Sequence, residues 1–275
     1  TDATPTNSAC ALALLTRAVQ SGQLLQRVLL MGDEQLPEPE HSLLTRGPLK
    51  ILLDDYRLPP FEQLCQRIAR GHRQGRAVAI HCVTSTELVF ALSALLESGT
   101  IPGDRIEHAS VTPDAALALL RETAVTVVTQ PGFVRERGDQ YLAEVEPREQ
   151  AWLYRCRSLV DHGIPLGGST DAPYGSADPW SAMAAAVQRR TRAGRAIGSS
   201  EQLTPERALA LFTSAPTAPG GPARHIEPGM PADLCLLDRP WAEARRRLTA
   251  DDVAATIRGG EVIYRRGAAT AHAPD

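Results

Sequence analysis

Two short stretches decide the fold of this chain: AVAIH at residues 77–81 and RIEH at residues 105–108. Each has the length of a single strand, ends in a histidine, and is followed by a longer stretch with helical periodicity. Short strand-like runs that alternate with helical periodicity are typical of repeated βα units around a parallel sheet. The chain is therefore expected to have an α/β fold.

The same alternation continues on both sides of these stretches. Strands are expected at residues 27–31, 49–53, 77–82, 105–108, 125–129 and 165–168. Helices are expected at 60–71, 85–98, 113–122, 148–162 and 178–193. Most steps between strands are about 20 to 40 residues, close to the ~30 residues of a βαβ unit. Because these strands are fewer than the eight that close a barrel, the prediction is a partial (β/α)8 TIM-type barrel.

The last fifth of the chain has a different character. A helix capped by Thr204 is expected to run to about Phe212. Residues 216–231 are rich in Pro and Gly, and residues 232–238 and 253–265 read as strands, the second with a Gly-Gly turn. We expect a barrel portion at residues 1–222 and a segment of a small C-terminal β-sandwich subdomain at 223–275.

Composition favours a protein that acts on small molecules. The formal net charge is -3 and no Lys/Arg block stands out, so neither nucleic acid nor a membrane is an expected partner. No run approaches the roughly 18 apolar residues of a membrane span. The five cysteines are scattered without a C-x-x-C pair, which favours a reduced, cytoplasmic protein. The expected partner is a small-molecule substrate, and a homodimer stays open.

Four residues of metal-site type lie near the carboxyl ends of predicted strands, where catalytic groups of such barrels gather: Lys50, His81, His108 and Asp171. Neutral imidazoles and oxygen donors hold Zn²⁺ or a similar ion and leave a position for water. Asp171 is the expected catalytic carboxylate, which takes the proton of that water and passes it to a leaving amine. Taken singly, each residue has a structural alternative: a core histidine, a surface lysine or a turn aspartate.

Three further polar residues, Asp54, Gln130 and Tyr174, are expected in loops that line the pocket. They are the candidate substrate-binding residues. The alternative for each is a solvated loop side chain, since many polar residues in loops only face water.

Several motifs follow one another along the chain: Lys50-x-x-x-Asp54, AIH at 79–81, RIEHA at 105–109, TQP at 129–131, GSTDAP at 168–173 and PGMPADL at 228–234. In this order they resemble strands four to eight and the returning sandwich segment of the metal-dependent amidohydrolase superfamily. Within that superfamily they resemble the branch that includes N-substituted formamide deformylases. The resemblance covers nearly the whole chain.

The resemblance implies specific roles for the four metal-type residues. Lys50 would be carboxylated by CO₂ and bridge two metals, and His81 and His108 would bind one divalent ion, with Zn²⁺ expected. Asp171 would contact the second ion and act as general acid and base. The family's strand-one His-x-His is not found among the seven histidines. With residues 1–5 taken as the end of strand three, the first strands are expected outside this sequence, which would then be a fragment.

Two functions remain open from the sequence. The first is a metal-dependent hydrolase of carbon–nitrogen bonds in amides, formamides or cyclic amides. The second is a truncated, catalytically inactive homologue, or a protein that binds a small molecule without turnover. The missing His-x-His pair favours the second, and the order of the four metal-type residues favours the first.

Overall fold

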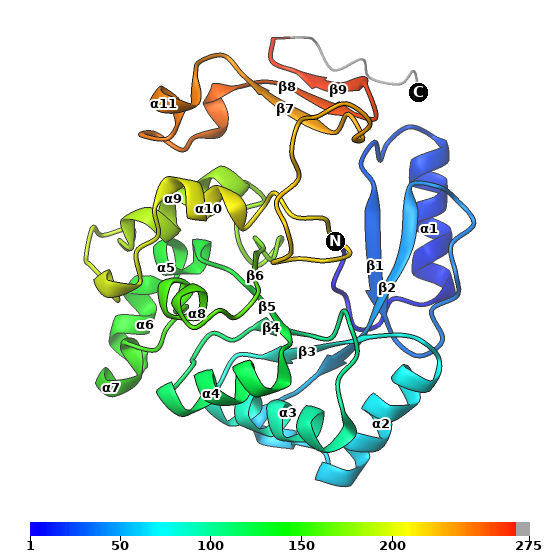
Figure 1. The fold of residues 1–275 in the computed structure, drawn as a ribbon, viewed down its shortest axis with the longest axis vertical. Helices are drawn as coiled ribbons and strands as arrows, with labels where there is room; N and C mark the ends of the chain where they lie inside the picture. Colours follow the sequence, from blue (N-terminus) through cyan, green and yellow to red (C-terminus); the bar gives the residue numbers. More distant parts are fainter. Residues whose placement is uncertain (268–275) are drawn as a thin grey trace.

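The computed structural model describes residues 1–267 and shows a curled, six-stranded parallel sheet (Figure 1). The strands lie side by side in the order of the sequence. They are β1 (Val28–Gly32), β2 (Leu44–Leu52), β3 (Val78–Cys82), β4 (Arg105–His108), β5 (Thr126–Thr129) and β6 (Leu166–Gly168). All of the expected strands are present, and the predicted α/β partial barrel is confirmed.

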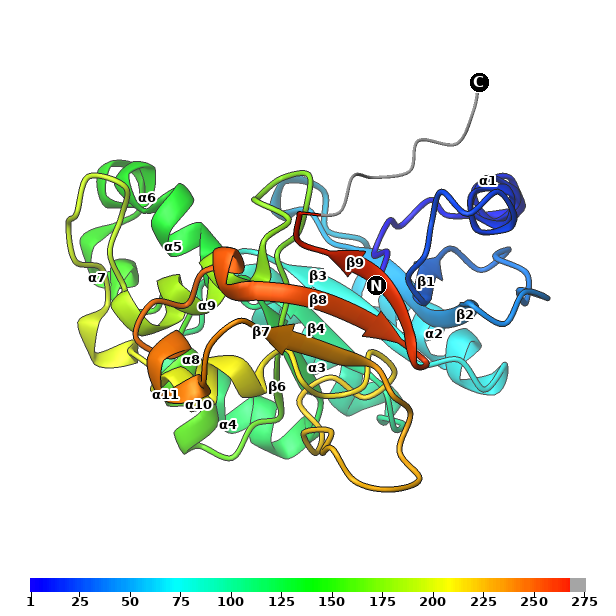
Figure 2. The same ribbon diagram turned by 90° about the horizontal axis from the view of Figure 1, so that it is seen from above.

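The helices lie on the outer side of the curled sheet, as Figures 1 and 2 show. They are α1 (Ala9–Gln20), α2 (Phe61–Arg73), α3 (Ser85–Ser98), α4 (Asp114–Thr123), α5 (Gly132–Glu136), α6 (Gly138–Glu144), α7 (Pro147–Gln150), α8 (Cys156–Asp161), α9 (Pro179–Gln188) and α10 (Pro205–Ala210). Among residues 1–267, no helix combines the length and apolar character needed to cross a membrane.

Alternation along the strands decides which face of the sheet is apolar. In β3, Val78, Ile80 and Cys82 are fully buried and belong to the main core, together with residues of α2, α3 and α4. Successive strand side chains point to opposite faces. Ala79 and His81 therefore project from the concave face, away from the helices. The convex face holds the core, and the concave face is left for polar groups.

The opening residues form an extended segment beside β1. Asp2 bridges Leu30 in parallel, and its N–H donates to the Leu29 carbonyl at 2.9 Å. β1 separates this segment from β2, which carries Lys50. If β2 corresponds to strand four of the resembling family, β1 corresponds to strand three. The assignment of residues 1–5 to strand three is therefore wrong by one strand, although their extended form is confirmed.

A small antiparallel sheet follows the barrel portion, with β7 (Leu234–Leu237), β8 (Val253–Arg258) and β9 (Glu261–Arg265) in that order. Gly259 and Gly260 join β8 to β9 with φ of 57° and 88°, the left-handed backbone that a tight hairpin turn requires. The expected small β subdomain is thus present, as one sheet within residues 1–267 rather than two layers. Leu248 and Val253 join the main core, and the boundary at residues 222/223 stays a prediction.

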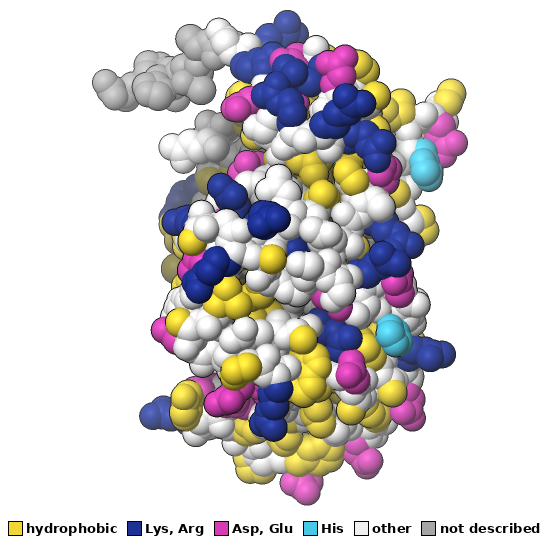
Figure 3. All heavy atoms as spheres, turned by 90° about the vertical axis from the view of Figure 1, so that its left-hand side faces the viewer, with side chains coloured by type: hydrophobic (Ala, Val, Ile, Leu, Met, Phe, Trp, Pro, Cys, Tyr) yellow, Lys and Arg dark blue, Asp and Glu magenta, His cyan; other side chains and the backbone are white. Residues whose placement is uncertain are grey.

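Basic side chains gather on the part of the surface at the top of Figure 3, with acidic side chains among them. The exposed ion pairs of the C-terminal part of the chain include Arg239 with Asp238 at 2.9 Å and Arg245 with Glu206 at 2.8 Å. The second pair joins the segment after α11 (Trp241–Ala244) to α10. Each such exposed pair contributes about 1 kcal/mol or less to stability.

Two predicted helices are shorter than expected, and a single buried arginine explains both. Residues 148–162 form α7 and α8 with a break between them, and α9 stops at Gln188. Arg189 is fully buried and has a left-handed backbone, with φ of 51°. Its guanidinium donates to the carbonyls of Leu153 and Tyr154, both at 2.9 Å, and to that of Ile197 at 3.0 Å. These hydrogen bonds fasten the segment between α7 and α8 to the loop that follows α9.

Replacing this arginine should therefore destabilise the protein strongly. For Arg189→Met we expect the free energy of unfolding to fall by about 3 to 5 kcal/mol, because several buried carbonyls lose a charged donor. The matched control is Arg190→Met, whose exposed side chain donates to the Gly194 carbonyl and to no other group within residues 1–267. That control should lose about 0.5 kcal/mol or less. Urea unfolding measures both, and equal losses would contradict the proposed fastening of the two segments.

Candidate active site

The strand register places two rows of side chains on the concave face of the sheet. In the first row, Lys50 of β2 pairs with Ala79 of β3, which pairs with Arg105 of β4. In the second row, two residues further along, His81 pairs with Glu107. Paired residues of neighbouring strands point to the same side of a sheet. Lys50, Arg105, His81 and Glu107 therefore share one face.

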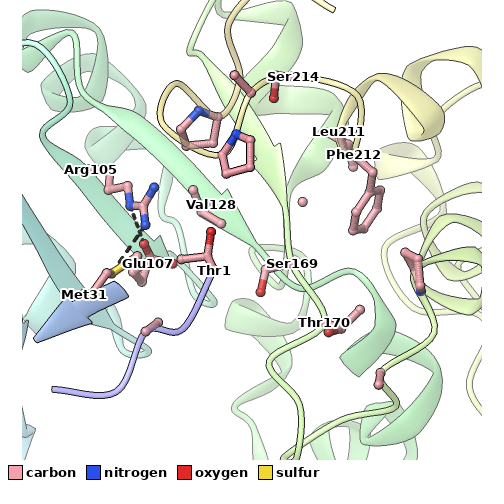
Figure 4. Close-up of a pocket in the computed structure, with 17 residues that line it drawn as sticks. Thr1, Met31, Arg105, Glu107, Val128, Ser169, Thr170, Leu211, Phe212 and Ser214 are labelled. Carbon is pink, nitrogen blue, oxygen red and sulfur yellow. Dashed lines mark hydrogen bonds and ion pairs between the residues drawn. The ribbon is translucent and has the colours of Figure 1, made fainter. Parts of the chain in front are cut away.

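Arg105 and Glu107 form a buried ion pair on this face. Their Nε and Oε1 atoms are 2.7 Å apart, and the two side chains are only 4% and 5% exposed. They line a cavity of about 350 Å³. Figure 4 shows them pointing into the cavity, across from Ser169 and Phe212. Water has little access to this pair, so each charge depends on the other.

Lys50 is a buried residue with 4% of its surface exposed, so the alternative of a surface lysine is excluded. Burial lowers the pKa of its ammonium group, and the carboxylate of Glu107 opposes that decrease. The positive charge of Arg105 lowers the pKa further. At a given pH, a larger fraction of Lys50 is therefore in the neutral amine form than for a solvated lysine.

A tight turn at the end of β4 brings the two candidate histidines together. Register pairs His108 with Cys82, whose side chain lies in the core on the convex side. His108 instead has a φ of 75°, and the N–H of Ala109 donates to the Glu107 carbonyl at 3.1 Å, which is the pattern of a γ-turn. The turn breaks the alternation, and the ring centroids of His108 and His81 lie 4.3 Å apart.

Both imidazoles are held in the neutral form. Burial lowers the pKa of His81 to about 3, and the neighbouring His108 and Lys50 add to the decrease. Burial lowers the pKa of His108 to about 4, with the charges of Lys50 and Arg137 acting the same way and the side chain of Gln130 opposing them. Neutral imidazole is the form that binds a metal ion. At neutral pH both rings are ready to act as ligands.

Asp171 faces the same concavity from the loop that follows β6. Its backbone is left-handed, with φ of 53°, and its N–H donates to the Ser169 hydroxyl at 3.2 Å. Burial raises the pKa of its carboxyl group, and Glu107 adds to the increase, whereas Lys50 and Arg137 oppose it. The structure thus places Asp171 within electrostatic reach of Lys50.

The donors on this face fit part of a metal site. Among residues 1–267, no three His, Cys, Asp or Glu side chains lie close enough together to hold an ion. His81 and His108, whose neutral rings are in contact, are suited to be two ligands of one ion. An amine is not an oxygen donor, so Lys50 would serve as one only when carboxylated. The metal-binding roles of Lys50 and Asp171 stay predictions.

The three candidate substrate-binding residues lie in different surroundings. Gln130 is 1% exposed and adjoins His108, a position suited to support the ring. Asp54 is exposed, accepts the N–H of Tyr56 at 3.0 Å, and lines a separate depression at the end of β2. Tyr174 is 72% exposed, in the loop after Asp171. Substrate contact by any of them stays a prediction.

Three charged residues of this region were not singled out from the sequence: Arg105, Glu107 and Arg137. The first two had a usable signal, because they lie two residues apart in a predicted strand and must share a face. Arg137 had none, since it lies between α5 and α6, in a stretch without an expected element. Its position depends on contacts with segments distant in the sequence.

Comparisons with known proteins point to one family. The model of the amidohydrolase family matches residues 2–264. An N-substituted formamide deformylase of Arthrobacter pascens is 27% identical over 85% of this chain, and a putative amidohydrolase, YtcJ, of Bacillus subtilis is 24% identical over 74%. The chain spans 48% and 40% of the length of these curated relatives.

Among solved structures, an uncharacterized metal-dependent hydrolase of Pyrococcus furiosus has a similar fold. Its TM-score is 0.65 and its sequence identity is 25%, with coverage of 76% of this chain and 49% of that protein. These figures agree with the partial barrel described above.

The buried ion pair gives a prediction about stability. Glu107→Gln should lower the free energy of unfolding by about 3 to 5 kcal/mol, because Arg105 is left without a counter-charge in a buried position. The matched control is Glu34→Gln, whose pair with Arg67 at 2.6 Å is partly exposed and worth about 1 kcal/mol or less. Urea unfolding of both variants measures the difference. A Glu107→Gln loss no larger than the control's would show that the pair is not needed.

Proposed function

Because the chain belongs to the amidohydrolase family, we propose that it acts as a hydrolase of a carbon–nitrogen bond in an amide, formamide or cyclic amide, with a divalent ion, Zn²⁺, as cofactor. The observation that carries the proposal is the contact between the neutral rings of His81 and His108 on the face that also holds Lys50. The similarity to a formamide deformylase and to a metal-dependent hydrolase supports this reaction class.

Each residue of the site has a chemical task in this proposal. His81 and His108 would hold the ion. Lys50 would add an oxygen ligand once its neutral amine has bonded to CO₂ and released a proton to form a carbamate. A bound divalent ion supplies an acidified water and a polarised substrate carbonyl. Asp171 takes the proton from the water and delivers it to the leaving amine. Its raised pKa brings the carboxyl group closer to the range in which it can exchange a proton.

A second function has a specific observation in its favour. No group of three His, Cys, Asp or Glu donors is formed within residues 1–267, and a site with two firm protein ligands suits weak binding rather than turnover. A protein that binds a small molecule without hydrolysing it is therefore the alternative. Metal binding and turnover, measured separately, distinguish the two.

The first test concerns the metal. Zn²⁺ binding, followed by calorimetry, should weaken by roughly tenfold or more in His81→Asn, because one of two imidazole ligands is lost. His225→Asn is the matched control, since His225 is exposed in a loop far along the chain. Its affinity for Zn²⁺ should equal that of the unchanged protein. Equal affinities in both variants would remove His81 from the metal site.

The second test concerns the proton transfer. Asp171→Asn should reduce kcat for an N-formyl amine by roughly 10² to 10⁴, the usual contribution of a general acid and base, with little change in stability. The control is Asp251→Asn, since Asp251 is an exposed acidic residue of the small subdomain, and its kcat should equal that of the unchanged protein. Metal binding without turnover of any amide by the unchanged protein would favour the non-catalytic alternative. Full activity of Asp171→Asn would show that Asp171 is only a turn residue.

A further inference from the structure

Arg137, at the junction of α5 and α6, is fixed beside the loop that carries Asp171. Its guanidinium carbon lies 4.2 Å from the ring centroid of Phe133. Its Nη2 donates to the carbonyl of Tyr174 at 2.8 Å, and the N–H of Tyr174 donates to the carbonyl of Asp171 at 2.8 Å. Arg137 is thus connected to the backbone of Asp171 through a single residue.

The charge of Arg137 is not neutralised by a direct ion pair in the described part of the chain. Within residues 1–267, no Asp or Glu carboxylate forms an ion pair with its guanidinium, whereas Arg155 pairs with Asp114 and Arg195 pairs with Asp139. A guanidinium that is half-buried and already oriented by a ring and a carbonyl loses little freedom when it binds an anion. The contact with Tyr174 uses its Nη2 atom and the Tyr141 hydroxyl lies beside the guanidinium, so part of its five N–H donors remains for a ligand.

Arg137 lies beside the loop of the proposed acid and base, because Tyr174 accepts from Arg137 and donates to the Asp171 carbonyl. Its positive charge also acts on His108 and Asp171. Its charge also acts on an aromatic pair, Tyr141 and Tyr154, whose hydroxyl groups are 3.0 Å apart. A ligand at His108 and Asp171 would therefore have a cation and aromatic side chains nearby.

We propose that Arg137 determines specificity by binding a carboxylate of the substrate, so that the site prefers N-acyl or N-formyl amino acids over neutral amides. This inference rests on the proposed function. A guanidinium matches the planar carboxylate with two parallel hydrogen bonds, and one cation matches its single charge. The carboxylate and the scissile amide of an N-acylated amino acid are separated by one carbon, which suits a cation placed beside the reacting groups.

The test uses two compounds that differ only in the carboxylate, N-formylphenylalanine and N-formylphenethylamine. With Zn²⁺ present, the unchanged protein should hydrolyse the first with the higher kcat/KM. At saturating Zn²⁺, Arg137→Gln should lower the ratio of kcat/KM for N-formylphenylalanine to that for N-formylphenethylamine by about 10- to 100-fold, through a higher KM for the first compound. Arg137→Lys should retain part of the preference. The matched control is Arg135→Gln, whose exposed side chain lies on α5.

The outcomes separate the inference from the proposed function. Hydrolysis of both compounds without a preference, or an equal loss on both in Arg137→Gln, would overturn the role of Arg137 and leave the hydrolase intact. If neither compound is hydrolysed, the proposed function fails for these substrates, and calorimetric binding of the two compounds decides about Arg137. Preferential binding of N-formylphenylalanine that Arg137→Gln abolishes would support the role. Equal binding of the two compounds, or none, would overturn it.

Discussion

The curled sheet has to hold Lys50, Arg105 and Glu107 out of contact with bulk water, and the rest of the site depends on how it does so. The convex face cannot accept them, because helices cover it with apolar side chains. Removing a charge from water costs several kcal/mol, so burial is tolerable only where charges compensate one another. Glu107 contacts Arg105 directly and opposes the effect of burial on Lys50. The concave face can therefore carry charged, reactive groups without a large loss of stability of the sheet.

Two of the proposed reactive residues lie where the regular strand structure has ended. His108, at the end of β4, and Asp171, in the loop that follows β6, both have left-handed backbones, with φ of 75° and 53°. Such conformations cost about 1 to 3 kcal/mol each and persist only where the surroundings enforce them. At His108 the result is visible: a regular strand would send the ring towards Cys82 and the core, and the turn sends it to His81. The strained turn at His108 thus creates the contact with the His81 ring that two ligands of one metal ion require.

Local patterns predicted the elements well, and long-range contacts account for what they missed. Each strand could be predicted because a short apolar run is a local signal. The positions of His81 at the end of one strand and of Asp171 just after another follow from the same signal. The break within residues 148–162 could not be predicted, because it depends on Arg189, which reaches the Leu153 carbonyl across 36 positions of the chain. Arg137 was missed for a similar reason, since its partner Tyr174 is 37 positions away.

The two proposals, taken together, connect metal binding with substrate binding. Lys50 and Arg137 are the cations whose charges act on His108, and both oppose the approach of a further cation to its ring. Carboxylation would replace the positive charge of Lys50 by a negative one, and a substrate carboxylate would neutralise Arg137. Each change makes the surroundings of His81 and His108 more favourable for a divalent ion. Because coupling of this kind is reciprocal, a bound ion would in turn strengthen the binding of an anionic substrate. The charges that act together with burial to keep the imidazoles neutral would then also link metal occupancy to the presence of an amide substrate that bears a carboxylate.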